Sequence, residues 1–400
     1  MTRWDPLPYV SRTRRRPGLS AESTMPRIVP HDGEHVDPTA DNSTISKRRA
    51  QTSGWCCNGP VTTRAALVPV VTGSTTLATG TTLSDADIGD LLSSAGALRG
   101  YLDGLPGVDA VGLNERAAVL GTRSIKRESK LFAIDLAMSM LDLTTLEGKD
   151  TPARVRSLCR RALHPDPTRP GGPRPAAVCV YPDLVAVARE VVGDDGVAIA
   201  SVATGFPSGR TSLAVKLADT TEAVAAGADE IDMVIDRGAF LAGDFSLVAE
   251  EVRAVKAACQ RADGTFAHLK VILETGELST YDNVRRASWL TMLAGADFIK
   301  TSTGKVTPAA TLPVTLLMLQ AVRDFRSATG RQVGVKAAGG IRSSKDAIRY
   351  LVTVHEIAGP DWLTPDYFRF GASSLLDDLI RQSLRMRTGG YVGADYVAQD

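Results

Sequence analysis

Eight short runs rich in β-branched residues alternate with longer amphipathic segments from residue 140 onward. Short runs of this kind are typical of β-strands, and the segments between them are long enough for helices that connect parallel strands. The predicted strands are residues 140–143, 177–181, 198–203, 230–235, 269–274, 297–301, 333–337 and 368–370. The predicted helices include residues 182–192, 212–226, 246–262, 280–294, 308–329 and 344–357.

This alternation predicts an α/β fold, a (β/α)₈ TIM barrel, because eight strand–helix units over about 250 residues match that architecture. The competing interpretation is an open, doubly wound sheet of six strands. Such a sheet would carry a Gly-x-Gly-x-x-Gly turn after its first strand, and the sequence has none there. In a barrel the functional residues lie at the carboxyl ends of the strands, so polar residues at those positions are the candidates.

The first 110 residues lack this pattern, and we expect them to form an N-terminal extension that is mostly disordered. One short helix is predicted from Ser84, an N-cap candidate, to Leu98, and a longer one from Asn114 to about Met138. The predicted division is an extension over 1–110, a barrel over 111–390 and a C-terminal tail over 391–400. The sequence decides neither the role of the extension nor whether Met25 is the true start.

Composition argues against several function classes. Forty-six Lys and Arg against 45 Asp and Glu give a net charge of +1, so no global field attracts nucleic acid or an anionic membrane. No stretch reaches the roughly 18 consecutive apolar residues of a membrane span, and no secretory signal is visible. The five cysteines have neither disulfide nor zinc-site spacing. We therefore expect a cytoplasmic protein without a bound metal.

Two lysines end neighbouring predicted strands. Lys300 follows Phe298 and Ile299, and Lys336 occupies the equivalent position in the next run. A strand-end lysine usually extends to solvent, but two side by side destabilise a barrel mouth and need an explanation. In class I aldolases a lysine forms a Schiff base as the free amine, and a neighbouring ammonium lowers its pKa.

A carboxylate joins the two lysines as a candidate. Asp232 lies in an apolar run, where an unpaired carboxylate would be costly and a lysine would satisfy it. The three residues form either a catalytic site or a buried ion pair without a chemical role.

Glycine-rich turns follow the last three predicted strands. They contain Gly304 beside Lys305, Gly339 and Gly340 before Arg342, and residues 371–374. Backbone amides, two cations and two hydroxyls are the composition of a phosphate site, and barrels often have one at this position. Each turn alone is more often ordinary turn geometry. Three at consecutive strand ends favour phosphate binding.

At these residues the sequence closely resembles the 2-deoxyribose-5-phosphate aldolase family. The resemblance is carried by residues 141–146, 177–182, 205–209, 227–232, 269–278, 295–305, 335–342 and 370–375. The stretch Phe-Ile-Lys-Thr-Ser-Thr-Gly-Lys, residues 298–305, and the Lys-Ala-Ala-Gly-Gly turn, residues 336–340, are its most specific parts. The first 110 residues have no counterpart in compact bacterial members of the family.

The resemblance implies a metal-independent class I lyase without a cofactor. Its reaction would be the reversible cleavage of 2-deoxy-D-ribose 5-phosphate to acetaldehyde and D-glyceraldehyde 3-phosphate, in deoxyribose phosphate catabolism. By resemblance, Lys300 forms the Schiff base, Lys336 perturbs its pKa, and Asp232 relays protons with Lys336. We assign ten residues to substrate binding: Cys179, Lys270, Thr301, Gly304, Lys305, Gly339, Gly340, Gly371, Ser373 and Ser374. The expected partner is a phosphosugar, and we expect a homo-oligomer that binds neither nucleic acid nor membrane.

Some features depart from the family or leave alternatives open. Ala337 stands where many members have proline, and Tyr391 and Tyr396 are candidates for the tyrosine that assists proton transfer in some bacterial members. One alternative is a different class I aldolase for phosphosugars, which a substrate panel would separate. The other is a non-catalytic phosphosugar-binding protein, which would form no covalent adduct on borohydride reduction. A metal-dependent aldolase is disfavoured, because no predicted strand end carries histidines.

Overall fold

The eight strands close into a barrel. The computed structural model describes residues 82–391 and 393. Its strands are β1 (Leu141–Thr144), β2 (Ala177–Val180), β3 (Ala198–Val202), β4 (Glu230–Val234), β5 (His268–Ile272), β6 (Phe298–Lys300), β7 (Gly334–Ala338) and β8 (Phe368–Ala372). Each strand pairs in parallel with the next, and β8 pairs with β1. The closed order confirms the predicted (β/α)₈ barrel and excludes the open sheet.

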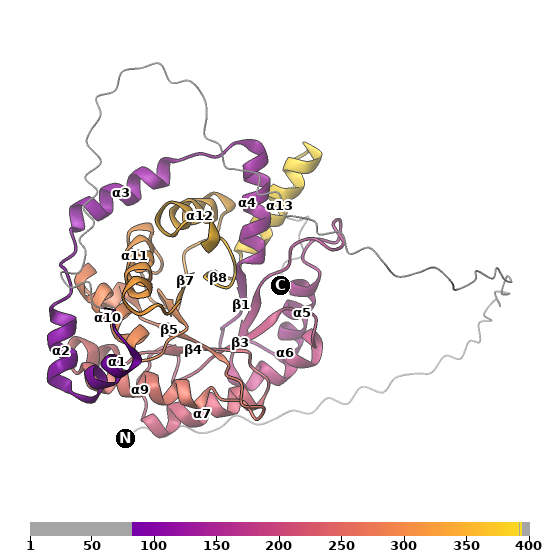
Figure 1. The fold of residues 1–400 in the computed structure, drawn as a ribbon. Helices are drawn as coiled ribbons and strands as arrows, with labels where there is room; N and C mark the ends of the chain where they lie inside the picture. Colours follow the sequence, from indigo (N-terminus) through magenta and orange to yellow (C-terminus); the bar gives the residue numbers. More distant parts are fainter. Residues whose placement is uncertain (1–81, 392, 394–400) are drawn as a thin grey trace, which may run out of the picture. The chain divides into compact units, whose positions relative to one another are not determined.

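Helices surround the strands in a ring (Figure 1). They are α5 (Pro152–Leu163), α6 (Val185–Val192), α7 (Leu213–Ala225), α8 (Arg237–Leu241), α9 (Phe245–Ala258), α10 (Tyr281–Leu293), α11 (Leu312–Thr329), α12 (Ser344–Ala358) and α13 (Leu375–Thr388). Short 3₁₀ helices are η1 (Pro182–Leu184), η2 (Thr275–Glu277) and η3 (Pro360–Trp362). Among the described helices, none is both long and apolar enough to cross a membrane.

The strands are buried on both faces, which explains their nearly continuous apolar runs. Every residue of β2, β4 and β7 is buried. Side chains between sheet and helices form the main core, where Trp289 of α10 meets Phe325 of α11 with ring centroids 5.4 Å apart. Seven of the buried charged residues lie on the strands and form the site described below: Asp142, Glu230, Asp232, Lys270, Lys300, Lys336 and Arg369.

Within residues 82–140, the described part of the chain before β1, four helices precede the barrel, where the sequence pattern predicted two. They are α1 (Asp85–Ser93), α2 (Ala95–Asp103), α3 (Ala110–Thr122) and α4 (Arg127–Ser139). The single helix expected from Ser84 to Leu98 is divided at Ser94, whose extended backbone (φ −127°, ψ 118°) ends α1 while its side chain caps α2. The helix expected from Asn114 is likewise interrupted by extended residues at Arg123 and Lys126.

These helices pack onto the outside of the barrel. Leu98 and Leu102 of α2 are fully buried, and the Tyr101 ring lies 5.9 Å from that of Trp289. Arg349 of α12 donates a hydrogen bond to the Gly121 carbonyl of α3, which runs beside α11 and α12 (Figure 1). The described part of the predicted extension, residues 82–110, is therefore mostly helical and packed. Residues 1–81, with Met25, and Tyr396 lie outside the described residues.

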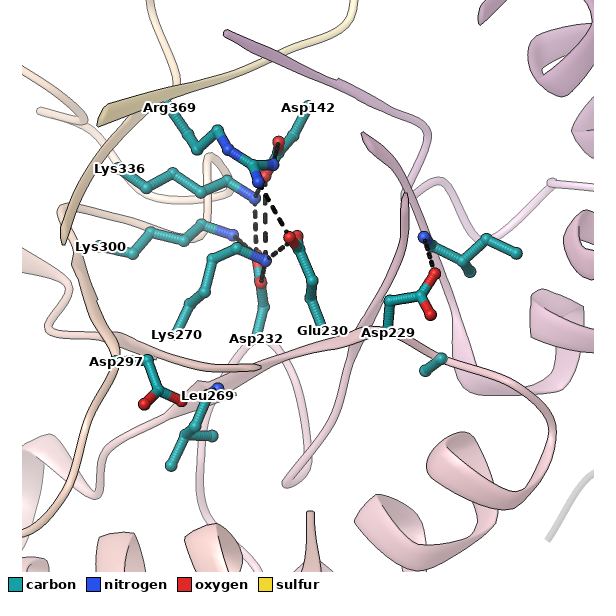
Figure 2. A network of polar contacts seen from close by, with 12 residues as sticks. Asp142, Asp229, Glu230, Asp232, Leu269, Lys270, Asp297, Lys300, Lys336 and Arg369 are labelled. Atoms are coloured by element: carbon teal, nitrogen blue, oxygen red, sulfur yellow. Dashed lines mark hydrogen bonds and ion pairs between the residues drawn. The ribbon is translucent and has the colours of Figure 1, made fainter. Parts of the chain in front are cut away.

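Two aspartates fix the amino-terminal ends of strands (Figure 2). Asp229 precedes β4 and accepts a hydrogen bond from the Ile199 amide of β3 at 2.8 Å. Asp297 precedes β6 and accepts one from the Leu269 amide of β5 at 2.7 Å. Each aspartate is the last residue of the same Gly-Ala-Asp sequence, residues 227–229 and 295–297. This repeated contact sets the register of neighbouring strands at the end of the barrel opposite the site.

Candidate active site

Two pairs of charged residues are neighbours in the barrel sheet. The register pairs Lys300 of β6 with Lys336 of β7, and Asp232 of β4 with Lys270 of β5. All four are buried, and their side chains meet inside the barrel (Figure 2). The structure thus brings together the three residues predicted to be catalytic, together with Lys270.

Asp232 is the centre of this group. Its Oδ2 lies 2.7 Å from the Nζ of Lys300 and 2.8 Å from the Nζ of Lys336. Its Oδ1 lies 2.9 Å from the Nζ of Lys270. One carboxylate therefore holds three amines, and two of these amines share a single oxygen.

Three further charged residues extend the network, and sequence reasoning did not assign them. Arg369 of β8 contacts Asp142 of β1 at 2.7 Å and Glu230 of β4 at 3.0 Å. Asp142 lies 2.5 Å from Lys336, and Glu230 lies 2.5 Å from Lys270. The available signal was the one that identified Asp232, a charged residue within an apolar strand run. Applied to every run, it would have found all three.

The buried network contains one more cation than anion. Its members are Lys270, Lys300, Lys336 and Arg369 against Asp142, Glu230 and Asp232. Buried charges are tolerated when they are paired, so an excess cation favours loss of one proton. The candidates are the lysines, because a guanidinium keeps its proton.

The pKa directions distinguish Lys300 from the other two lysines. Burial lowers the pKa of Lys300, and nearby Lys336 adds to this although Asp232 opposes it. Burial would also lower the pKa of Lys336, but Asp142 and Asp232 raise it above its ordinary value. Asp232 and Glu230 likewise outweigh burial and raise the pKa of Lys270. Lys300 is therefore the network's most readily formed free amine, which is the form that attacks a carbonyl.

Asp232 itself stays ionised. Burial alone would raise its pKa, but Lys270, Lys300 and Lys336 hold it well below the usual range. Cys179 of β2 is fully buried, and burial raises the pKa of its thiol. Its protonated form has little nucleophilic character, which is compatible with a contact role but not with covalent chemistry.

Thr301 joins the ends of β6 and β7. Its Oγ1 accepts a hydrogen bond from the Ala338 amide at 3.0 Å and donates to the Ala338 carbonyl at 3.3 Å. Lys270 is equally occupied, since its Nζ lies within 2.9 Å of both Glu230 and Asp232. Thr301 and Lys270, two of the ten predicted substrate-binding residues, therefore both bond to other residues of the protein.

The predicted glycine turns meet at the carboxyl ends of β6, β7 and β8. Gly304, Gly339 and Gly340 all have positive φ values, near 80°, which non-glycine residues rarely adopt. A Cβ on Gly339 would lie 3.1 Å from the Gly304 Cα, and the Gly339 amide donates to the Gly371 carbonyl at 3.2 Å. A Cβ on Gly371 would lie 3.1 Å from Lys336 Cε. The three turns thus touch one another directly beside the lysine network.

Exposed polar groups surround these turns. Gly340, Ser373 and Ser374 are exposed, and Ser374 is the N-cap residue of α13 with no side-chain capping bond. Lys305 is exposed and pairs with Glu147 at 2.9 Å. Free amides and hydroxyls at a helix N-terminus are suited to bind an anion. Tyr391, a candidate for assisting proton transfer, is 87 % exposed near the end of the described part of the chain.

Within the described residues, no group of three His, Cys, Asp or Glu side chains is arranged to hold a metal ion. The buried carboxylates of the network are instead paired with lysines and arginine.

An aldolase family profile, curated aldolase sequences and a solved aldolase structure all resemble this chain. The sequence profile of the DeoC/LacD family of aldolases matches residues 131–380. The deoxyribose-phosphate aldolase of Homo sapiens is 43% identical over 289 residues, which cover 70% of this chain and 89% of the relative. That of Agrobacterium fabrum is 46% identical over 248 residues, covering 62% and 90%. The tetrameric deoxyribose phosphate aldolase structure from Aeropyrum pernix superposes with a TM-score of 0.50 and 27% identity, covering 66% of this chain and 97% of that one.

Proposed function

The chain belongs to the DeoC/LacD family of aldolases, and within it to the deoxyribose-phosphate aldolases, and on that premise we propose that Lys300 carries its chemistry as a Schiff base. The proposed reaction is the reversible cleavage of 2-deoxy-D-ribose 5-phosphate to acetaldehyde and D-glyceraldehyde 3-phosphate, a step of deoxyribose phosphate catabolism. The observation that carries the proposal is the shared Asp232 oxygen, which lies 2.7 Å from Lys300 and 2.8 Å from Lys336.

The reaction begins with the neutral amine of Lys300. It attacks the C1 aldehyde of the open-chain sugar, and loss of water from the resulting carbinolamine gives an iminium ion. Asp232 and Lys336 relay the protons that these steps require, because both lie next to the amine. Formation of the iminium from the neutral amine takes up one proton and places a positive charge on the Lys300 nitrogen. The charge of the buried network therefore rises by one as the adduct forms.

The iminium then accepts the electron pair of the breaking C2–C3 bond. Removal of the C3 hydroxyl proton turns C3 into the aldehyde of glyceraldehyde 3-phosphate, which leaves an enamine on Lys300. Protonation of the enamine at C2 and hydrolysis of the new iminium release acetaldehyde and restore the amine. Asp232, ionised and hydrogen-bonded to protonated Lys336, is suited to exchange these protons.

The glycine turns bind the substrate phosphate in this proposal. Gly304, Gly339, Gly340 and Gly371 supply closely approachable backbone, and Ser373 and Ser374 supply hydroxyls at the α13 N-terminus. Lys305, exposed beside Gly304, contributes positive charge. In this proposal the inner surface of the substrate site is shaped by the buried side chains of Cys179, Lys270 and Thr301.

The decisive experiment combines turnover with trapping. Retro-aldol activity on 2-deoxyribose 5-phosphate is measured with and without EDTA, and the enzyme is reduced with borohydride in the presence of substrate. We expect activity to survive chelation and mass spectrometry to place the reduced adduct on Lys300. No adduct at all would support the non-catalytic binding protein instead. Activity confined to other phosphosugars in a substrate panel would support a different class I aldolase.

We also propose that the chain forms a homo-oligomer. The supporting observation is the tetrameric state of the Aeropyrum pernix relative. Light scattering after size-exclusion chromatography tests it, and a mass of one 42.4 kDa chain would refute it.

A further inference from the structure

A second polar cluster lies at the barrel mouth, above the lysine network. Its centre is Glu274, which follows β5, is fully buried, and adopts the left-handed conformation (φ 53°, ψ 60°). This conformation costs energy for a residue with a Cβ, and such strain persists where the surroundings require it. The backbone on either side is fixed, because the amides of Leu273 and Thr275 donate to the carbonyls of Lys300 and Thr301 at 2.9 Å.

The Glu274 carboxylate is directed at the loop after β6. It accepts hydrogen bonds from the Thr303 amide at 3.2 Å and from the Thr303 hydroxyl at 2.5 Å. The same hydroxyl accepts a hydrogen bond from the Lys305 amide at 3.1 Å. Glu274 thus determines, through Thr303, the backbone path on both sides of Gly304.

Arg237, the first residue of α8, connects this pair to two more loops. It lies 3.3 Å from Glu274 and donates hydrogen bonds to the carbonyls of Pro207 and Ser208 in the loop after β3. We call Arg237, Glu274 and Thr303 the mouth clasp. It links the loops after β3, β4, β5 and β6, all at the carboxyl ends of the strands.

We propose that Glu274 is a positioning residue that sets the affinity for the phosphate of the substrate, by holding Thr303 and with it the Gly304–Lys305 backbone. The proposal rests on the phosphate assignment made above. Among the interactions of the described residues, the Glu274 side chain contacts Thr303 and Arg237 and does not contact the lysine network. It therefore acts on binding of the phosphate end and leaves the amine of Lys300 unchanged.

The chain offers a matched control on the same 3₁₀ turn. Glu277 pairs with the Nε of Arg237 at 2.8 Å, but its side chain is 40% exposed. Its side chain pairs with Arg237 and not with Thr303. Glu277→Ala removes a carboxylate from this loop without releasing Thr303, so it separates the clasp from a general loss of negative charge at the mouth.

The test measures KM and kcat of Glu274→Ala, Glu274→Gln and Glu277→Ala on 2-deoxyribose 5-phosphate and on unphosphorylated 2-deoxyribose. Loss of charge-assisted hydrogen bonds to Thr303 should raise KM for the phosphorylated substrate about 10-fold in Glu274→Ala. We expect kcat/KM for 2-deoxyribose to change less than about 3-fold, because no phosphate contact is involved. Glu274→Gln keeps an acceptor oxygen and should recover most of the loss, whereas Glu277→Ala should resemble the wild type.

Two further measurements complete the test. Borohydride trapping with acetaldehyde, which has no phosphate, should proceed at the wild-type rate in Glu274→Ala. Calorimetric titration with glycerol 3-phosphate reports phosphate affinity without turnover. Equal losses for both sugars, or wild-type affinity of Glu274→Ala for glycerol 3-phosphate, would overturn the proposal. A wild-type protein that binds glycerol 3-phosphate but forms no adduct would instead refute the Schiff-base function while the clasp stands.

Discussion

Replacing Lys336 with methionine tests the charge balance of the buried network most directly. The Nζ atoms of Lys300 and Lys336 lie 2.7 and 2.8 Å from the same Asp232 oxygen. They are therefore at most about 5.5 Å apart, and two unit charges at that distance repel by about 3 kcal/mol at an effective dielectric constant of about 20. In Lys336→Met this repulsion is absent, and the remaining three cations balance the three carboxylates. Lys300 should then keep its proton.

The expected result is a slow but intact nucleophile. About 3 kcal/mol corresponds to roughly a 100-fold smaller fraction of free amine at neutral pH. Borohydride trapping with acetaldehyde should slow by about that factor at pH 7 and recover as the pH rises, so the rising limb of the pH–rate profile moves to higher pH. The fold should survive, because Asp142 keeps Arg369 and Asp232 keeps Lys270 and Lys300 as partners.

Lys345→Met is a suitable control, since Lys345 is exposed on α12 and lies outside the network. It loses a lysine without changing the buried charge, so its trapping rate and pH profile should match the wild type. An unchanged trapping rate at pH 7 in Lys336→Met, with a native circular dichroism spectrum, would refute the charge-balance reasoning.

Three other outcomes are expected. Lys300→Arg should abolish trapping, because a guanidinium is too basic to attack a carbonyl; an adduct found by mass spectrometry on another lysine would contradict the assignment. Gly340→Asp and Ser374→Asp should raise KM for 2-deoxyribose 5-phosphate while kcat changes little, because a carboxylate there repels phosphate; lost kcat with unchanged KM would count against the phosphate site. Finally, Asp142 and Asp232 have lowered pKa values, so their stabilising effect is present above about pH 4 and is lost as the pH falls. Urea midpoints that stay constant in wild type from pH 6 to pH 3 would disagree.

The barrel was predictable because its signal is repeated eight times. Each strand is buried on both faces, so each appears as an apolar run between helix-length segments. Strand ends were less exact: β6 ends at Lys300 rather than Thr301, because the Thr301 side chain bonds to Ala338 and its backbone begins the loop. The division of the helix expected from Ser84 depends on a single extended residue, Ser94, which the apolar periodicity does not reveal.

The candidate site was predictable in part. Lys300, Lys336 and Asp232 could be grouped because their strands are close in the barrel order and their side chains need partners. The roles of Asp142 and Arg369 depend on closure between β1 and β8, which are separated by more than 220 residues in sequence. Glu274 was visible as a charged strand-end residue, but its contact with Thr303 depends on a left-handed backbone at that position, which sequence does not specify.

The Asp142–Arg369 contact has a consequence for how reactivity arises during synthesis. It lies at the seam where the first strand meets the last, so a nascent chain that ends before β8 contains every lysine of the network but lacks Arg369. In such a chain Asp142 and Glu230 are without their guanidinium, and the barrel that buries Lys300 is not closed. If Lys300 is the nucleophile as proposed, its reactivity is a product of completed folding, and labelling of Lys300 by a carbonyl reagent would report the moment at which the polypeptide becomes reactive.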